Sequence, residues 1–379
     1  MDFGLSKEYV LLQEMYRNFA INEVKPYAAE VDEEEKFPVE TVEKLKKFGF
    51  LGIPYPKEIG GQGGNNLMYA MAVEELSKHC ATTGVIVSAH TSLGAAPIYE
   101  FGTPDQKERY LSDLASGKKL GAFGLTEPNA GTDAASQQTV AVKDGDDYII
   151  NGSKIFITNA GYADVYIIFA MTDKSAGLKG ITAFIIEADT PGFSIGKKEL
   201  KLGIKGSATC ELIFEDCRVP ASNMLGKEGR GFKIAMKTLD GGRIGIAAQA
   251  LGIAQGALDA TVEYVKERKQ FGRSISKFQN TQFVLADLDA KIEAARLLVY
   301  KAACKKDAKA PYTVDAARAK LIAAETAMEV TTKCVQLHGG YGYTREYPVE
   351  RMMRDAKITE IYEGTSEVQR MVIAGNLLR

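Results

Sequence analysis

The chain has 379 residues, of which 45% are hydrophobic and 25% charged, as expected for a globular protein of two or three domains. Its net charge of −2 argues against nucleic acid or an anionic membrane as a partner. No apolar run approaches the roughly 20 residues that span a bilayer, and the acidic segment 1–35 is unlike a targeting sequence. We therefore expect a cytoplasmic (bacterial) protein, with the mitochondrial matrix as the less favoured alternative.

The N-terminal zone, residues 1–120, has the periodicity of helices. Leu11, Met15 and Phe19 recur at a spacing of four, which places them on one helix face. The glycine-rich stretch 60–64 marks a loop between two helical segments. We expect an N-terminal α-helical domain.

The middle zone, residues 121–228, changes to short β-branched and aromatic runs separated by turn sequences such as Asn151-Gly152. No long helix alternates with these runs, which disfavours a parallel βαβ sheet. The pattern predicts a middle antiparallel β domain. The clearest strand candidates are 148–150, 154–158, 165–169 and 182–186.

The C-terminal zone, residues 229–379, returns to helical spacing in long segments. Three apolar stripes begin near Ile244, Val284 and Leu321. Amphipathic helices of this length pack on each other as a bundle. The sequence therefore predicts an α+β protein with a helical domain, a β domain and a C-terminal helical bundle.

Several common signatures are missing. No Gly-x-x-x-x-Gly-Lys-Ser/Thr loop, no complete Gly-x-Gly-x-x-Gly after a strand and no Gly-x-Ser-x-Gly elbow occurs. The five cysteines form no Cys-x-x-Cys pair, and the three histidines, His79, His90 and His338, lie far apart. We therefore expect reduced cysteines, no metal centre and no Rossmann domain.

The run Ile361-Tyr362-Glu363-Gly364-Thr365 places a carboxylate between an aromatic ring and a glycine. Loss of water from such a carboxylate disfavours its charged form and makes it a stronger base. Gly364 lets a flat substrate approach the backbone closely. Read locally, an exposed turn remains an alternative.

Three further segments could bind a cofactor. In 123–133, a Pro128-Asn129 turn and Gly131 would let backbone amides converge on a ligand, and 156–158 offers an aromatic face and a hydroxyl. The arginine-containing segment 268–279 could grip a pyrophosphate. The segment 336–343 ends a helix with glycines. Taken singly, each also fits an ordinary surface loop or a charged helix end.

Taken together and in this order, the segments closely resemble the acyl-CoA dehydrogenase family over essentially the whole chain. The shared blocks are Leu-Thr-Glu-Pro-Asn-Ala-Gly-Thr-Asp, Lys-Ile-Phe-Ile-Thr-Asn, Arg-x-x-Phe-Gly, Gln-x-x-Gly-Gly-Tyr-Gly and Ile-Tyr-Glu-Gly-Thr. The chain is most similar to the short-chain, butyryl-CoA group. The resemblance implies a four-helix C-terminal bundle and FAD bound without a Rossmann domain.

The resemblance also implies the cofactor contacts. The flavin side of FAD would meet Phe123, Leu125, Thr126, Gly131, Thr132, Phe156 and Thr158. The phosphates and adenine would meet Arg268, Gln270, Gln279, Gln336, Leu337, His338, Gly339 and Gly340, and Thr365 and Glu367 would also touch the cofactor. Many relatives have tryptophan where Phe156 stands, and this chain has none. Because some family contacts reach the flavin of a neighbouring subunit, a homotetramer is implied.

For catalysis, the resemblance implies that Glu363 takes the α-proton while the β-hydride passes to flavin N5. The thioester oxygen would be held by the Glu363 backbone amide and a flavin ribityl hydroxyl. Some family members carry their base at the position of Gly242, so Glu363 has no competitor there. Substrate contacts would come from Thr132, Asp240, Arg243, Tyr362 and Gly364.

We therefore expect FAD-dependent dehydrogenation of a short acyl-CoA, of the butyryl-CoA to crotonyl-CoA type, with electrons passed to an electron-transferring flavoprotein. The alternatives are a short branched-chain acyl-CoA dehydrogenase, an acyl-CoA oxidase that uses oxygen, and a non-catalytic flavoprotein scaffold. The presence of Glu363 argues against the scaffold. Leu93, Ile98, Gln249 and Leu251 could lie near the acyl pocket, whose depth the sequence leaves open.

Overall fold

The computed structural model describes residues 4–378. Its N-terminal part is helical, and the longer helices there continue through short π-helical or 3-10 segments. The helices are α1 (Lys7–Phe19), α2 (Ala28–Glu33), α3 (Val39–Lys47), α4 (Asn66–Ser77), α5 (Ala81–Ala89), α6 (Ala96–Phe101), α7 (Pro104–Gln106) and α8 (Ser112–Ala115). Every residue of α5 is buried, which makes it a central helix of this part.

The middle part is a mainly antiparallel sheet. Its strands are β1 (Gly121–Gly124), β2 (Val140–Asp144), β3 (Asp147–Thr158), β4 (Val165–Met171), β5 (Ile181–Glu187), β6 (Phe193–Lys198), β7 (Thr209–Pro220) and β8 (Met224–Leu225). They follow the order β6-β7-β3-β2-β4-β5-β8, with β1 beside β4. The hairpins are antiparallel as predicted.

The pairing around β4 differs from the sequence prediction. β1 pairs with β4 in parallel, Gly121 lying opposite Val165, and β2 meets β4 in parallel at one bridge. The parallel start is fixed by Asp164, whose carboxylate accepts a hydrogen bond from the Leu120 backbone N–H at 2.7 Å. A contact between residues 44 positions apart leaves no mark on the local pattern.

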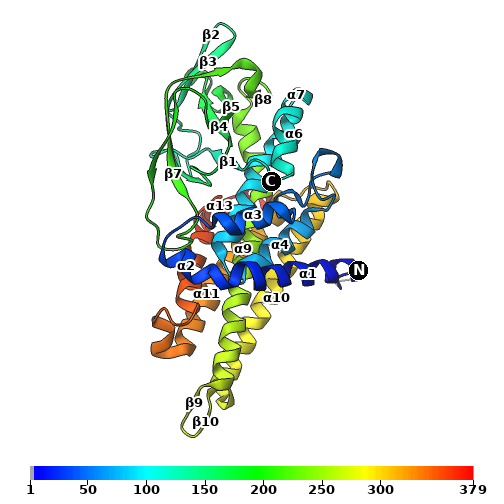
Figure 1. Ribbon diagram of the computed structural model, residues 1–379, viewed down its shortest axis with the longest axis vertical. Helices are drawn as coiled ribbons and strands as arrows, with labels where there is room; N and C mark the ends of the chain where they lie inside the picture. Colours follow the sequence, from blue (N-terminus) through cyan, green and yellow to red (C-terminus); the bar gives the residue numbers. More distant parts are fainter. Residues whose placement is uncertain (1–3, 379) are drawn as a thin grey trace.

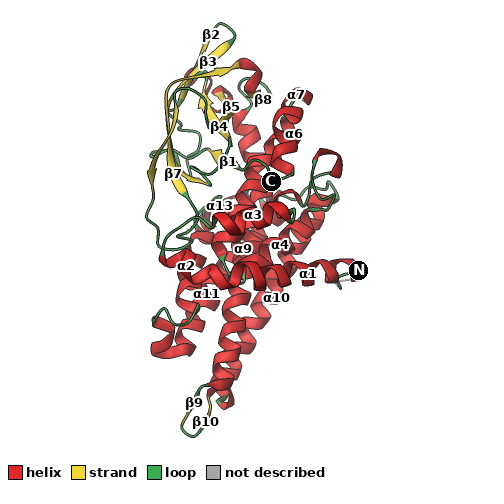
Figure 2. Ribbon diagram, viewed as in Figure 1, coloured by secondary structure: helices red, strands yellow, loops and turns green. Residues whose placement is uncertain are grey.

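The C-terminal part is a bundle of long helices (Figures 1 and 2). It contains α9 (Gly231–Glu267), α10 (Gln279–Asp307), α11 (Thr313–His338), α12 (Val349–Lys357) and α13 (Ser366–Leu377), with a hairpin of β9 (Lys269–Gln270) and β10 (Arg273–Ser274). α9 runs from the β domain to this hairpin at the opposite end of the molecule (Figure 1). The three-part fold predicted from the sequence is confirmed.

Helix α4 packs closely on α9, because glycines replace side chains at their contact. A Cβ on Gly252 would lie 2.3 Å from the carbonyl oxygen of Glu74, and one on Gly256 would lie 2.1 Å from that of Lys78. Neither position can carry a larger residue without separating the helices. The N-terminal part and the bundle therefore share one core.

All three parts meet at α12. Arg354 donates hydrogen bonds to both carboxylate oxygens of Asp32 on α2, at 3.0 and 2.6 Å, and to the carbonyl oxygen of Leu202 in the β domain at 3.2 Å. Next to it, the Asp355 carboxylate accepts a hydrogen bond from the Ile204 backbone at 2.5 Å. This junction fixes the turn that follows α12 relative to the β domain. Within residues 4–378, no helix combines the length and apolarity needed to cross a membrane.

Candidate active site

The predicted base lies in the turn between α12 and α13. Thr365 ends this turn and caps α13, its hydroxyl oxygen accepting a hydrogen bond from the Val368 backbone at 3.3 Å. Glu363 has a φ of 53° and Gly364 a φ of 96°, both in the left-handed region. Such a conformation is uncommon for a residue other than glycine and concentrates at functional sites. It turns Glu363 back toward α9.

The carboxylate of Glu363 lies against Gly242 of α9. A Cβ on Gly242 would lie 2.0 Å from Glu363 Oε2 and 2.9 Å from Leu93 Cδ2. No side chain therefore fits at position 242 while Glu363 occupies this place. The two positions predicted for the base in different family members are thus adjacent in space, and only one of them can carry a side chain here.

Burial raises the pKa of Glu363 to about 8, opposed by the nearby cations Lys320 and Arg243. Glu363 Oε2 is buried and has no hydrogen-bond partner. Buried polar atoms are usually paired, so an unpaired carboxylate oxygen is a candidate for contact with a ligand.

Asp240 and Arg243, two of the predicted substrate residues, lie within the same turn of α9 as Gly242. Arg243 donates to Asp240 Oδ1 at 2.7 Å, and the Thr313 hydroxyl donates to Asp240 Oδ2 at 2.6 Å. Both Asp240 oxygens are thus occupied by protein groups. Arg243 Nε is buried without a partner, so it is a donor available to a ligand.

Tyr362 packs beneath the turn. Its hydroxyl donates a hydrogen bond to Gln249 Oε1 on α9, and Gln249 Nε2 donates to the Ala81 carbonyl oxygen at 3.0 Å. Gln249, expected near an acyl pocket, is therefore joined to the turn that carries Glu363, and Leu93, also expected there, lies beside Gly242. The Tyr362 hydroxyl is occupied by this contact.

The sequence interpretation missed Lys320 of α11, which is fully buried. Its ammonium donates to the carbonyl oxygen of Gly364 at 2.7 Å. The sequence carries a signal for it, because Lys320 shares one face of α11 with Ala316, Ala323 and Ala327, all fully buried. A lysine within a buried alanine face has to meet a polar group.

The predicted flavin loop is attached to β3 by a buried ion pair, which the sequence interpretation also missed. Lys154 donates to Glu127 Oε1 at 2.7 Å, to Gln137 Oε1 at 3.0 Å and to the Leu125 carbonyl oxygen at 3.3 Å. The Ile155 backbone N–H donates to the Thr126 carbonyl oxygen at 2.9 Å. The loop residues Leu125 and Thr126 are therefore held at a fixed place along β3.

The other predicted flavin residues lie around this loop. Phe123 is half-buried and meets Phe169 edge-on, with ring centroids 5.0 Å apart, and Thr158 ends β3. Gly131 and Thr132 are exposed, and a Cβ on Gly131 would meet nothing within 4 Å. Phe156 is 57% exposed, with a φ of 60°. A large ring held outward on a strand beside an open loop fits a flat aromatic ligand such as a flavin.

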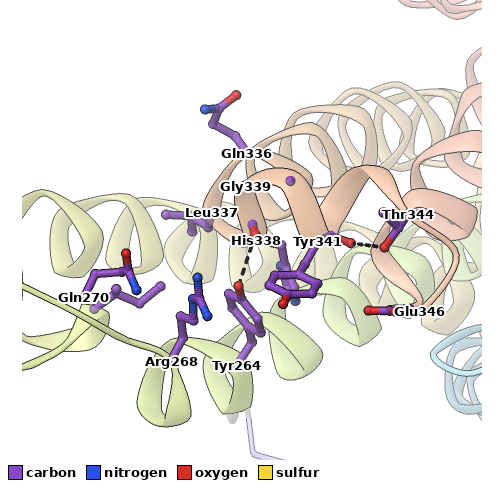
Figure 3. Close-up of a pocket in the computed structure, with 12 residues that line it drawn as sticks. Tyr264, Arg268, Gln270, Gln336, Leu337, His338, Gly339, Tyr341, Thr344 and Glu346 are labelled. Carbon is purple, nitrogen blue, oxygen red and sulfur yellow. Dashed lines mark hydrogen bonds between the residues drawn. The ribbon is translucent and has the colours of Figure 1, made fainter.

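A second group of predicted residues lines a cavity of about 570 Å³ at the end of α9 and α11 (Figure 3). Tyr264 stacks on His338 with ring centroids 4.1 Å apart and donates to its carbonyl oxygen at 3.2 Å. Seven predicted phosphate and adenine contacts line this cavity, namely Arg268, Gln270, Gln336, Leu337, His338, Gly339 and Gly340. Gln279 is exposed at the start of α10 and is not among the lining residues.

The two predicted halves of the cofactor site are not brought together within one chain. The cavity lies near the β9–β10 hairpin, at the opposite end of the bundle from the β domain with Thr126 and Phe156 (Figure 1). Thr365 and Glu367 belong to the turn and α13, next to Glu363 rather than to the cavity. The sequence grouped these residues by motif, whereas the fold separates them.

Family models agree with the class of protein that this fold and site define. The acyl-CoA dehydrogenase N-terminal domain matches residues 6–118, the middle domain matches 122–217, and the C-terminal domain matches 229–378. The chain belongs to the acyl-CoA dehydrogenase family and is an enzyme of the oxidoreductase class.

Individual relatives are similar over their full length. A short-chain specific acyl-CoA dehydrogenase of Clostridium acetobutylicum is 67% identical, with all of both chains covered. The butyryl-CoA dehydrogenase structure of Megasphaera elsdenii is 57% identical with a TM-score of 0.98, again over all of both chains. A chain solved in work on the electron transferring flavoprotein of Acidaminococcus fermentans and flavin-based electron bifurcation is 58% identical, with a TM-score of 0.99 and full coverage of both.

Proposed function

We propose that the protein is an FAD-dependent short-chain acyl-CoA dehydrogenase that converts butyryl-CoA to crotonyl-CoA. The observation that carries the proposal is the buried, unpaired Oε2 atom of Glu363, which lies against Gly242. The short-chain specific and butyryl-CoA dehydrogenases that the chain resembles support the choice of substrate.

FAD is the cofactor, as in the family, whose solved relatives include an FAD complex that is 32% identical to this chain. The exposed ring of Phe156 and the open loop at Gly131 suit its flavin, and the Arg268 cavity suits its phosphates. When bound, FAD supplies the acceptor for the β-hydride.

The chain supplies the base and its surroundings. Glu363 in its ionised form takes the α-proton of the acyl group, and its raised pKa makes it a stronger base than a carboxylate in water. Arg243 Nε is a free donor near this carboxylate. As the family resemblance implies, the backbone amide of Glu363 holds the thioester oxygen and so stabilises the developing enolate.

The substitution Glu363→Gln tests this mechanism. The variant should keep FAD and bind butyryl-CoA, while kcat falls by roughly 10²–10⁴, because the amide cannot accept the proton. The measurement is steady-state turnover together with anaerobic bleaching of the flavin by butyryl-CoA. Near-normal turnover would place the base elsewhere. Parent enzyme that holds FAD yet shows no bleaching would favour a non-catalytic scaffold.

The electron acceptor is proposed to be an electron-transferring flavoprotein, supported by the similar chain solved in work on such a flavoprotein. Slow reoxidation of the reduced enzyme in air would agree with this acceptor, whereas rapid oxygen consumption would indicate an oxidase. A panel of acyl-CoA substrates that includes isobutyryl-CoA and isovaleryl-CoA separates straight-chain from branched-chain specificity.

The proposed assembly is a homotetramer in the cytoplasm of a bacterium. Its support is the separation of the two halves of the cofactor site, which a neighbouring subunit would complete. The division into domains 1–120, 121–228 and 229–379 belongs to the same proposal; the element changes lie between Ala115 and Gly121 and between Leu225 and Gly231.

A further inference from the structure

The structure encloses an ammonium group close to the predicted base. Lys320 is fully buried in the first half of α11, and burial lowers its pKa to about 8. It forms no ion pair within 4.0 Å among the described residues, and its ammonium donates only to the Gly364 carbonyl oxygen, at 2.7 Å. Burying a charge without an opposite charge beside it lowers stability. We therefore expect this lysine to serve the site that lies next to it.

The charges around Lys320 leave Glu363 as its counterpart. Glu360 and Glu367 also act on it, but Glu360 is paired with Lys357 at 2.6 Å and the Glu367 side chain is 78% exposed. The nearby cation Arg243 is already neutralised by Asp240 at 2.7 Å. Of the carboxylates around Lys320, Glu363 is the one with a buried, unpaired oxygen, and Lys320 is a fully buried cation that no carboxylate pairs with among the described residues.

The same lysine also fixes the backbone that aims the base. The Gly364 carbonyl oxygen accepts hydrogen bonds from Lys320 and from Gln369 Nε2, the latter at 2.8 Å. Because Glu363 and Gly364 both have left-handed backbones, the turn depends on such contacts to persist. Lys320 brings a charge to this carbonyl, whereas Gln369 brings a neutral donor.

We propose that Lys320 is a positioning residue for Glu363: it fixes the Gly364 carbonyl and supplies a positive charge that favours the ionised form of the Glu363 carboxylate against the effect of burial. The inference rests on the proposed function, in which Glu363 is the base. It concerns a residue that does not itself contact the reacting atoms.

The test compares Lys320→Met with Gln369→Leu in the FAD-loaded enzyme, because each removes one donor to Gly364 and only the first removes a charge. The readout is the pH dependence of kcat/KM with butyryl-CoA. Lys320→Met should move the midpoint of the profile upward by roughly one to two pH units, because loss of a nearby cation disfavours the carboxylate. Gln369→Leu should lower kcat and leave the midpoint in place, and Lys320→Arg should restore it. Equal midpoints in the parent, Lys320→Met and Gln369→Leu would overturn the proposal.

A second measurement does not depend on turnover. Thermal unfolding of the holoenzyme is compared for Lys320→Met alone and in the Glu363→Gln background. Lys320→Met should lower Tm when Glu363 is present. In the Glu363→Gln background it should raise Tm, because the buried Lys320 ammonium has no counter-charge there and its removal relieves that cost. Equal Tm changes in both backgrounds contradict the proposal. If Lys320→Met does not fold, Lys320→Gln keeps a donor without a charge and should show the same upward shift.

The two hypotheses fail in different ways. Normal turnover of Glu363→Gln would reject Glu363 as the base, whatever the Tm coupling shows. If Glu363→Gln is inactive but Lys320→Met leaves the midpoint of the kcat/KM pH profile unchanged, Glu363 remains the proposed base and the role of Lys320 is rejected.

Discussion

At the scale of single residues, the protein keeps two opposite charges, Glu363 and Lys320, in an interior that disfavours both. Burial raises the pKa of the carboxyl and lowers that of the ammonium. A group with a perturbed pKa costs stability and gains reactivity, and such groups concentrate at functional sites. The loss of stability caused by burying Glu363 can therefore be measured without substrate.

Glu363→Gln should be more stable than the parent at alkaline pH. The carboxyl has an ordinary pKa of 4.5 in the unfolded chain and about 8 in the folded protein. Its stabilising contribution is therefore complete below about pH 4.5 and is lost as the pH rises through about 8. Glutamine does not titrate, so the Tm advantage of the variant should grow between about pH 5 and pH 8.5. Parallel Tm curves for the two holoenzymes would contradict the raised pKa.

At the scale of elements, strand β3 connects the flavin loop to the sheet through Lys154. Burial lowers the pKa of Lys154 to about 8, although Glu127 at 2.7 Å opposes the shift. The Glu127 carboxylate also accepts backbone hydrogen bonds from Gln138, at 2.5 Å, and Thr139, at 3.0 Å. One buried ion pair therefore orders a loop that has little regular structure of its own.

Lys154→Met should destabilise the protein by about 3–5 kcal/mol, because it leaves Glu127 buried without its cation. FAD retention should fall as well, since the loop loses its attachment at Leu125. The matched control is Lys143→Met, an exposed lysine on neighbouring β2, which should change stability by less than about 0.5 kcal/mol. Denaturant unfolding and flavin content after gel filtration provide the two readings. Equal stability of the two variants would show that the pair is dispensable.

At the scale of the whole molecule, the separation of the two cofactor regions is the main organising feature. Gly242 and Lys320 lie in the first halves of the long helices α9 and α11. The Arg268 cavity lies at the other ends of these helices (Figure 3). A straight bundle cannot fold its own far end onto the β domain. This shape is the reason why we propose a cofactor site composed of residues from two subunits.

Mixed assemblies test the shared site. Arg268→Ala and Glu363→Gln should each be weakly active alone, the first through lost FAD affinity and the second through the lost base. Denaturing and refolding the two variants together should restore activity to about a quarter of the parent activity. Random pairing makes about half of all pairs mixed. In each mixed pair one of the two sites receives both an intact Arg268 and an intact Glu363. Activity that is only the mean of the two variants would place each cofactor site within one chain.

Much of this architecture was predictable, and the physical reasons are local. Helical and strand periodicities set the order of the three parts, and the turn sequences placed the hairpins. Glu363 and the seven cavity residues could be proposed from the sequence because the motifs that carry the family resemblance are short and contiguous; their roles stay predictions. The parallel pairing of β1 with β4 was not found, because it depends on the long-range contact of Asp164 with Leu120.

By itself, then, the sequence determined the fold class and the family resemblance, and it named a candidate for the base. Only the tertiary structure showed that the Glu363 carboxylate lies against Gly242 and that Lys320 donates to the Gly364 carbonyl from 44 residues away. It also showed that the predicted cofactor residues form two distant groups. The reason is that periodicity and motifs depend only on residues that are close together in the sequence. Burial and charge pairing are decided by which distant segments the packed helices bring together.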